Sequence, residues 1–318
     1  MIRFLRRLLA LGFLLLLLGI GAAWLGWQYE LRRDPMALLD RGPLAYRLAA
    51  EESSEATTQA GELRVFRHIT LDAGLANPVR FTVSLPGNTH GPLPAVLILG
   101  GLEIGRESLG YLAHHGHNAL VAYQYPGEGA AWYEGAWMRR IPAMRRAALE
   151  VPAQVDVILA WMSDQTWVEP ERISVMGYSF GAAFLPACLR VAQAHGRSLG
   201  PTVVAYGGAD LPSLLEVNVD LQPRWLRRAV ARLLALALRP LEPARHGPHL
   251  RGTFLFINGR RDALIPPANA LALQASVPGP HRVVWLEAGH MNPGDPLLLA
   301  QIIRLSRNWL LEQKALNP

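Results

Sequence analysis

Ser179 stands between two glycines in the pentapeptide Gly-Tyr-Ser-Phe-Gly over residues 177–181, and it is the side chain best placed to do chemistry. Residues 172–176 before it are typical of a short buried strand, and residues 182–197 after it have apolar positions at helical spacing. A tight strand-to-helix turn strains the serine backbone and lifts the hydroxyl clear of the sheet, while the glycines avoid collisions with neighbouring elements. The pattern therefore predicts a nucleophile that attacks carbonyl carbon.

Two residues that could activate this serine follow it in the chain. Asp262 lies in the loop after an apolar run of strand length over residues 253–258, and His290 follows another predicted strand over residues 281–286. In an open parallel sheet the loops after the strands share the edge where ligands bind, so the three side chains are expected to converge. His290 would then accept the proton of the Ser179 hydroxyl, and Asp262 would hold the imidazole in the required tautomer.

The acid and the base each have an alternative interpretation. Asp210 follows a predicted strand over residues 202–206 and could serve as the acid instead. Asp262 could cap the helix expected after Pro267, and His290 could be an ordinary surface histidine. We favour Asp262 over Asp210 as the acid, and His290 as the base because it follows the last predicted strand.

These motifs resemble those of the α/β-hydrolases, and the similarity extends over roughly residues 62–313. It rests on the serine pentapeptide, on the acid loop over residues 259–266 and on the Gly289-His290 pair. The resemblance implies a mostly parallel central sheet flanked by helices, with a small helical cap inserted at about residues 208–250. It also implies a hydrolase that acts on a small-molecule ester or thioester and needs no metal or organic cofactor. A catalytically silent binding protein with this fold, or a peptidase or acyltransferase using the same side chains, is the alternative.

The resemblance further implies an oxyanion hole after the predicted strand over residues 94–99. In this family one backbone N–H comes from the loop after that strand and one from the residue after the nucleophile, which here are Leu102 (or Gly101) and Phe180. Two such donors stabilise the transition state by roughly 3–4 kcal/mol each. Leu99 replaces the histidine found in many lipases and esterases, and the glycine-rich turn is similar to the dienelactone-hydrolase and acyl-thioester-hydrolase branches.

Two further features lie beside the expected pocket. Glu103 and Arg106 would pair with each other and hold the oxyanion loop, with contact of one of them to substrate as the alternative. Residues 125–129 follow a predicted strand and resemble the turn that the family places next to the site.

A cluster of histidines, His114, His115 and His117, suggests a metal site at first sight. The cluster is better explained as cations that close a helix beginning after Gly105, with Gly116 as its cap. We therefore expect no metal there.

The N-terminal segment decides where the chemistry would take place. Residues 8–27 carry no charged side chain, and at 1.5 Å per residue a helix over them would span about 30 Å, the thickness of a bilayer core. Arginines precede this segment and interfacial aromatic residues lie at its end: Arg3, Arg6, Arg7, Trp24, Trp27 and Tyr29. The pattern predicts a single-pass membrane anchor with a cytoplasmic N-terminus and an exported hydrolase domain, periplasmic if the source is bacterial. A signal peptide cleaved near residues 21–23, which would give a secreted protein, is the alternative.

The sequence predicts three regions, namely an anchor over residues 1–33, a linker over residues 34–60 and a hydrolase domain over residues 61–318. Residues 51–60 are rich in Ser, Thr and Glu, which is typical of a solvated connector. The only cysteine, Cys188, is expected to be a buried apolar residue on the helix behind the serine, so no disulfide can form within the chain.

The net charge of +6 is concentrated in two segments. Residues 1–33 carry five arginines and one glutamate, and residues 224–251 carry seven arginines and one glutamate, so the rest of the chain is net acidic. A nucleic-acid-binding protein would need a basic face interleaved with aromatic or base-reading side chains. This distribution supplies none, and we expect no nucleic-acid partner.

The second basic segment predicts a cap helix over residues 224–239. Arg224, Arg228, Arg232 and Arg239 would form one stripe of this helix, and leucines cover most of the rest. Such a helix could rest on anionic lipid, or it could be a plain cap with a solvated charged face. Both versions favour a lipophilic acyl substrate close to a membrane.

Overall fold

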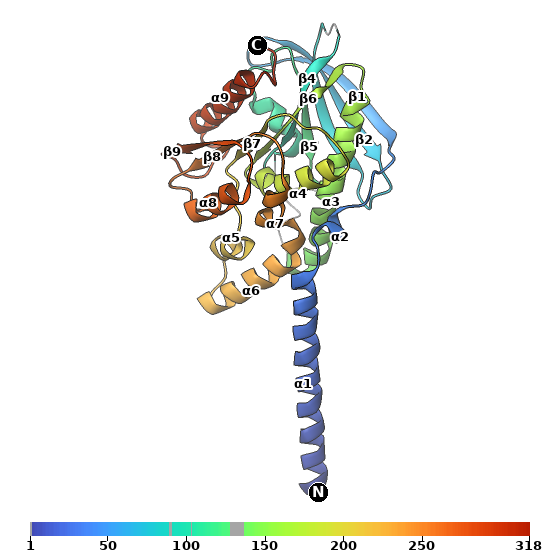
Figure 1. Cartoon of the computed structure of the whole chain (residues 1–318), viewed down its shortest axis with the longest axis vertical. Coiled ribbons are helices and arrows are strands. Elements are labelled where there is room, and N and C mark those ends of the chain that lie inside the picture. The colour runs from blue at the N-terminus through green and yellow to red at the C-terminus, as the bar shows by residue number, and fades with distance from the viewer. Residues whose placement is uncertain (1, 89–90, 103, 128–136) are drawn as a thin grey trace.

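The computed structural model describes residues 2–88, 91–102, 104–127 and 137–318, and its main body is one sheet with helices on both faces (Figure 1). In the described part of the chain, nine strands pair in the order β1 (Arg47–Thr57), β2 (Leu63–Asp72), β3 (Val79–Pro86), β5 (Ala119–Gln124), β4 (Leu93–Leu99), β6 (Val168–Tyr178), β7 (Thr202–Ala205), β8 (Phe254–Gly259) and β9 (His281–Leu286). The pairs from β1 to β5 are antiparallel, and the pairs from β5 to β9 are parallel. The mostly parallel sheet flanked by helices is confirmed.

Helices occupy most of the connections between the parallel strands. The described helices are α1 (Ile2–Arg32), α2 (Met36–Leu39), η1 (Gly105–Tyr111), α3 (Trp137–Ser163), α4 (Phe180–Ala194), α5 (Leu211–Asn218), α6 (Arg224–Ala237), η3 (Arg239–Leu241), α7 (Pro243–His246), η4 (Gly247–His249), α8 (Pro267–Ser276) and α9 (Pro296–Glu312). Those from α5 to η4 lie between β7 and β8 and form the helical insertion expected at about residues 208–250.

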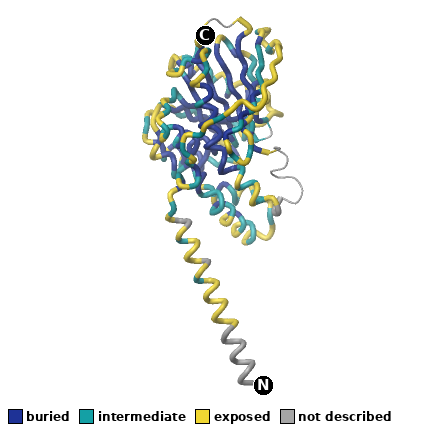
Figure 2. The backbone as a smooth tube through the Cα atoms, turned by 90° about the vertical axis from the view of Figure 1, so that its right-hand side faces the viewer, coloured by how far each residue is buried: buried dark blue, intermediate teal, exposed yellow. Residues whose placement is uncertain are grey.

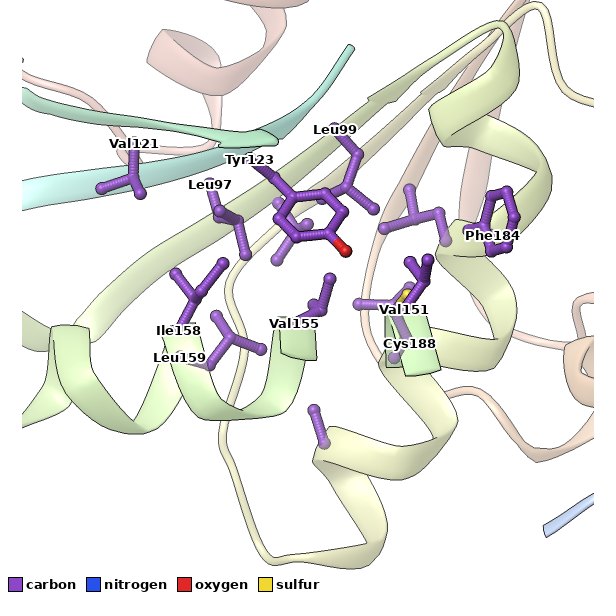
Figure 3. Packing of buried hydrophobic residues seen from close by; sticks show 14 of the residues in the cluster. Leu97, Leu99, Val121, Tyr123, Val151, Val155, Ile158, Leu159, Phe184 and Cys188 are labelled. Atoms are coloured by element: carbon purple, nitrogen blue, oxygen red, sulfur yellow. The ribbon is translucent and has the colours of Figure 1, made fainter. Parts of the chain in front are cut away.

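The central strands are apolar on both faces because both faces are covered. In β4 every residue is buried, and alternate side chains enter two separate cores. Leu97 and Leu99 face α3 and α4, where they lie near Tyr123 and Val155 (Figure 3). Ile98 points to the opposite core, which α9 closes. A strand buried on both faces reads as a continuous apolar run, which is why these strands can be located from the sequence.

The prediction of a solvated connector over residues 51–60 is wrong for most of that range. It belongs to β1, which pairs with β2 from Arg47 opposite Asp72 to Thr57 opposite Leu63. All of β1 is exposed, so its sequence carries no alternation of apolar and polar residues. Backbone pairing and cross-strand charges, such as the 2.6 Å bridge between Arg67 and Glu51, hold it instead.

The segment after α1 is docked on the helical side of the domain. Leu39, at the end of α2, is fully buried in the main core. Asp40 follows it, and one of its carboxylate oxygens lies 2.9 Å from Nε2 of His195, just after α4. The other ring nitrogen of His195 lies 2.8 Å from a carboxylate oxygen of Asp156 on α3. The first part of the expected linker is therefore structured as well.

Helix α1 projects away from this domain (Figure 1), and most of its described side chains are exposed (Figure 2). Its window Gly12–Tyr29 has a mean hydropathy of 1.4, and none of that window is buried. By length and composition α1 can cross a membrane, as a signal anchor or a signal sequence would.

The basic helix is shorter than expected. Helix α6 ends at Ala237, and Arg239 opens the 3-10 helix η3. Pro240 is the physical reason, because a proline cannot continue an α-helix and disfavours the helical conformation of the residue before it. The helical stripe therefore contains Arg224, Arg228 and Arg232 without Arg239.

The explanation offered for the histidine cluster is also wrong. The helix after Gly105 is the 3-10 helix η1 and ends at Tyr111, before the cluster begins. His115 is buried, and its ring nitrogens lie 2.9 Å from Oγ of Ser84 and 3.1 Å from the carbonyl oxygen of Leu109. Burial lowers the pKa of His115, so this residue is a neutral core histidine rather than a helix-capping cation.

Candidate active site

Ser179 forms a sharp turn between β6 and α4. Its φ of 51° and ψ of −110° are strained for a residue with a side chain, and its N–H donates to the carbonyl oxygen of Ala205 at 2.9 Å. A Cβ added at Gly181 would lie 2.0 Å from the carbonyl oxygen of Leu99, and one at Gly177 would lie 3.0 Å from atoms of α4. Both glycines are therefore required for the close approach of strand and helix that creates the turn.

Asp262 follows β8, and its carboxylate is almost completely enclosed, with 1% of the side chain exposed. One oxygen accepts the backbone N–H groups of Leu264 and Ile265 at 2.8 and 2.9 Å. The other oxygen lies 2.7 Å from Nδ1 of His290. The three acceptor contacts satisfy an ionised carboxylate in a buried position.

The alternatives for the acid do not fit these contacts. Asp210 is exposed and precedes α5, with its backbone N–H bonded to Glu242. Helix α8 begins after Pro266 and has no side-chain cap, so Asp262 is not its N-cap. The structure places Asp262, and not Asp210, beside the histidine.

His290 follows β9 and joins the other two side chains. Its Nε2 lies 2.7 Å from Oγ of Ser179, and its Nδ1 faces Asp262. Because an ionised carboxylate can only accept, Nδ1 carries the proton and donates it, which leaves the lone pair of Nε2 free. The Ser179 hydroxyl therefore donates to Nε2, and the three groups form one directed chain of hydrogen bonds.

The loops after β8 and β9 are fixed to each other by their backbones. The N–H groups of Arg260 and Arg261 donate to the carbonyl oxygens of Leu286 and Ala288 at 2.8 and 3.0 Å. A Cβ at Gly259 would lie 2.6 Å from that Ala288 oxygen, so only glycine allows this contact. The distance between acid and base is thus set by the sheet rather than by two free loops.

Tyr206, which the sequence analysis overlooked, packs against the imidazole. Its ring meets the ring of His290 edge to face, with 5.4 Å between centroids, and it has a positive φ of 57°. Its hydroxyl is buried without a partner among the described residues. Burial, followed by the charges of Asp262 and Asp295, raises the pKa of Tyr206 to about 12, so the phenol stays neutral. Its place at the end of a parallel strand, as for Ser179, was the signal that could have found it.

The predicted oxyanion segment lies beside the turn at Ser179. Leu99 is the neighbour of Gly177 across β4 and β6, so the loop after it starts next to the serine turn. The Gly101 carbonyl accepts the N–H groups of Ile104 and Gly105 at 3.2 and 3.0 Å.

The two proposed donors belong to this loop and to the start of α4. Leu102 is half-buried against the core, and Phe180 opens α4 with its ring against Tyr125. Their role, like that of Gly101, stays a prediction. Glu103, and residues 128–129 of the expected turn, lie outside the described residues, so the pairing of Glu103 with Arg106 stays a prediction too.

Comparison with known proteins rests on structure. The sequence matches no family model, and no curated protein has a significantly similar sequence. Acetyl xylan esterase 1 from Thermoanaerobacterium sp. is similar with a TM-score of 0.61 and 15% identity, over 87% of this chain and 92% of that chain. Acetyl xylan esterase from Paenibacillus sp. R4 is similar with a TM-score of 0.62 and 17% identity, over 88% and 93%.

An S-formylglutathione hydrolase from Agrobacterium tumefaciens is also similar, with a TM-score of 0.54 and 14% identity, over 84% of this chain and 99% of that chain. Sequence identities this low show only that the folds are similar. The similarity extends over most of this chain and most of each neighbour. The chain has the α/β-hydrolase fold.

Proposed function

We propose that this chain is a membrane-anchored serine hydrolase that cleaves a carboxylic ester or thioester through an acyl-enzyme on Ser179. The observation that carries the proposal is the hydrogen-bond path from Asp262 through His290 to the Ser179 hydroxyl, which ends at a strained turn. These three side chains can perform acyl transfer without a metal ion or an organic cofactor.

Acylation begins at Oγ of Ser179. The hydroxyl gives its proton to Nε2 of His290 as Oγ attacks the carbonyl carbon, and the carbonyl π electrons move onto oxygen. The imidazolium keeps its Nδ1–H bond to Asp262, whose charge stabilises it. The tetrahedral intermediate then collapses, His290 passes the proton to the departing alcohol or thiol, and the acyl group remains on Ser179.

Deacylation repeats these steps with water. Nε2 of His290 takes a proton from water as its oxygen attacks the acyl carbon. The second tetrahedral intermediate expels Oγ of Ser179, which regains the proton from His290, and the carboxylic acid leaves. In both halves the backbone N–H groups of Phe180 and Leu102 (or Gly101) are the proposed donors to the oxyanion.

The similar solved structures are compatible with this choice of substrate. Two of them are acetyl xylan esterases, and the third is named for S-formylglutathione, which is a thioester. Oxygen and sulfur leaving groups are therefore both included in the proposal.

The anchor in this proposal is α1, with the hydrolase domain outside the cytoplasm. Its uncharged core and the preceding arginines support this orientation. Fractionation tests it, because an uncleaved anchor keeps the full-length chain in the membrane after a high-salt and alkaline wash. Release of a shorter chain that starts near residue 24 would instead support the cleaved signal peptide.

Covalent labelling with a fluorophosphonate tests the catalytic proposal. In the wild type, Oγ of Ser179 should attack the phosphorus of the probe and expel fluoride, which leaves a phosphonyl group on Ser179, whereas Ser179→Ala should stay unlabelled. Ser53→Ala, which changes an exposed serine on β1, is the matched control and should label fully. A folded wild type that does not react would support the binding-protein alternative.

A substrate panel then defines the acyl and leaving groups. Purified enzyme is given p-nitrophenyl esters of increasing chain length, acyl-thioesters and small peptide amides. We expect turnover of esters or thioesters. A strong rate on amides with none on esters would contradict the proposal and favour a peptidase.

A further inference from the structure

Helix α6 presents a basic surface that the catalytic proposal does not use. It carries Arg224, Arg227, Arg228 and Arg232 and contains no acidic residue. Arg224, Arg228 and Arg232 are exposed and four residues apart, so they form a row along one face. Arg228 bonds to Glu216 of α5 at 2.7 Å. Within the described part of the chain, Arg224 and Arg232 form no salt bridge, so this row keeps uncompensated positive charge.

Large apolar side chains lie next to these arginines. Trp225 is 70% exposed and Leu233 is 63% exposed, and each directly follows an arginine of the row. Ala229 lies between them on the same face and is also exposed. Ala231 and Ala235, at the arginine edge of this face, are buried against the domain. A face that combines arginines with a tryptophan and a leucine is typical of helices that lie in a membrane interface.

The position of α6 fits this use, because its C-terminal end lies next to the end of α1. Arg245 of α7 donates to the carbonyl oxygen of Arg33 at 3.2 Å. Arg190 of α4 lies 3.7 Å from Asp34. Figure 1 shows α6 as the lowest helix of the domain, running across the axis of α1. If α1 crosses a bilayer, α6 is therefore held at the surface from which α1 emerges.

We propose that the exposed face of α6 lies on the anionic headgroups of the membrane that α1 crosses. The arginine row contacts phosphate groups, and Trp225 and Leu233 enter the boundary between headgroups and acyl chains. This inference rests on the proposed membrane anchor, but it is independent of the chemistry at Ser179. It assigns to α6 a lipid surface as its partner rather than a solvated cap.

Cysteine labelling in nanodiscs tests the contact on the full chain. Cys188 is the only cysteine and is buried, so a new cysteine can carry an environment-sensitive fluorophore alone. Ala229→Cys puts the label on α6 between Trp225 and Leu233, and Ser53→Cys on β1 is the matched control. Both are reconstituted in phosphatidylcholine discs with and without phosphatidylglycerol, and lipids spin-labelled near the headgroup serve as quenchers.

The label at position 229 should shift to the blue and lose more than half of its emission to the quencher in discs with phosphatidylglycerol, while the label at position 53 should not change. The double variant Arg224→Gln/Arg232→Gln should remove most of that quenching. A label at position 229 that behaves like the control would overturn the proposal. Equal quenching in pure phosphatidylcholine would overturn the role of the arginines.

The anchor and the α6 contact can fail separately. Co-elution of the chain with the discs reports insertion of α1, whatever the label does. Turnover of an ester by the same samples reports the chemistry at Ser179. An inserted and active protein with an unquenched label at position 229 would therefore contradict the α6 contact alone.

Discussion

Two histidines in this molecule each have an aspartate carboxylate beside Nδ1, but their roles differ. His290 lies 2.7 Å from Asp262 through Nδ1, and His195 lies 2.8 Å from Asp156 through Nδ1. The difference is at Nε2, which faces the Ser179 hydroxyl in one case and the Asp40 carboxylate at 2.9 Å in the other. A hydroxyl can donate to a neutral imidazole, whereas a second carboxylate needs an imidazolium.

The comparison shows that an Asp–His pair is not by itself a sign of catalysis. His195 bridges two carboxylates on the helical side of the domain, and Arg197 also bonds to Asp156. The bridge joins the segment after α1 to α3 and α4, so its role is structural. At His290 the second nitrogen keeps a lone pair for a proton, which is what a general base requires.

The largest effect should come from changing the acid at the active site. In Asp262→Asn the amide NH2 can donate to Nδ1, which favours the proton on Nε2 and prevents that atom from accepting from Ser179. We expect kcat on an ester to fall by about 10,000-fold. Asp156→Asn is the matched change at the other histidine and should leave kcat of the folded enzyme unaltered. Equal losses in both variants would remove the functional distinction between the pairs.

The free energy of unfolding should depend on His195 more than on His290, the reverse of the order expected for activity. His195→Gln removes one partner from Asp156, a buried carboxylate, and one from Asp40, so we expect the free energy of unfolding to fall by about 2 kcal/mol. Urea denaturation of the detergent-solubilised chain measures this. His290→Gln should abolish activity with a smaller change in stability. If His290→Gln destabilised the fold more than His195→Gln, the assignment of roles would be reversed.

Tyr206 sharpens the comparison of the two histidines, because its ring packs against the imidazole of His290 and not against that of His195. Tyr206→Leu removes the edge-to-face ring contact, which is worth roughly 1 kcal/mol, so kcat should fall up to tenfold with KM little changed. Tyr206→Phe keeps the ring and loses only a hydroxyl that has no partner among the described residues, so it should restore most of kcat. A loss of kcat in Tyr206→Phe as large as that in Tyr206→Leu would show that the hydroxyl, and not the ring contact, is required.

The smallest effect is a pH dependence of stability. Burial lowers the pKa of His195, but its hydrogen bonds to Asp156 and Asp40 outweigh burial and raise the pKa above 6.5. Its stabilising contribution is therefore complete below about pH 6.5 and lost as pH rises through the folded-state pKa. Unfolding free energies from pH 6 to 9 should decline less in His195→Gln than in wild type. Parallel pH profiles would contradict the charged bridge.

The inner strands of the parallel half could be predicted because they are buried on both faces. Strands β4 and β8 appear in the sequence as apolar runs with turn residues after them, and the rule for loops at one sheet edge brought Ser179, Asp262 and His290 together.

The remaining features depend on contacts that a sequence does not display. Strand β1 is exposed throughout, so only backbone pairing identifies it. The bridge at His195 joins Asp40 and Asp156, which are far apart in the chain and follow no motif. The 3-10 helix η1 is too short to leave a periodic pattern, and for this reason the role first assigned to His115 was wrong.

The docking of α2 limits how the domain can move relative to α1. A flexible connector of the length first expected would let its two ends drift roughly 30 Å apart in any direction. Instead Leu39 is fully buried and Asp40 is bonded to His195, directly after the end of α1, which leaves almost no slack. On a bilayer the Ser179 hydroxyl would therefore stay at one height, and a substrate would be selected by how far its acyl bond protrudes as well as by its chemistry.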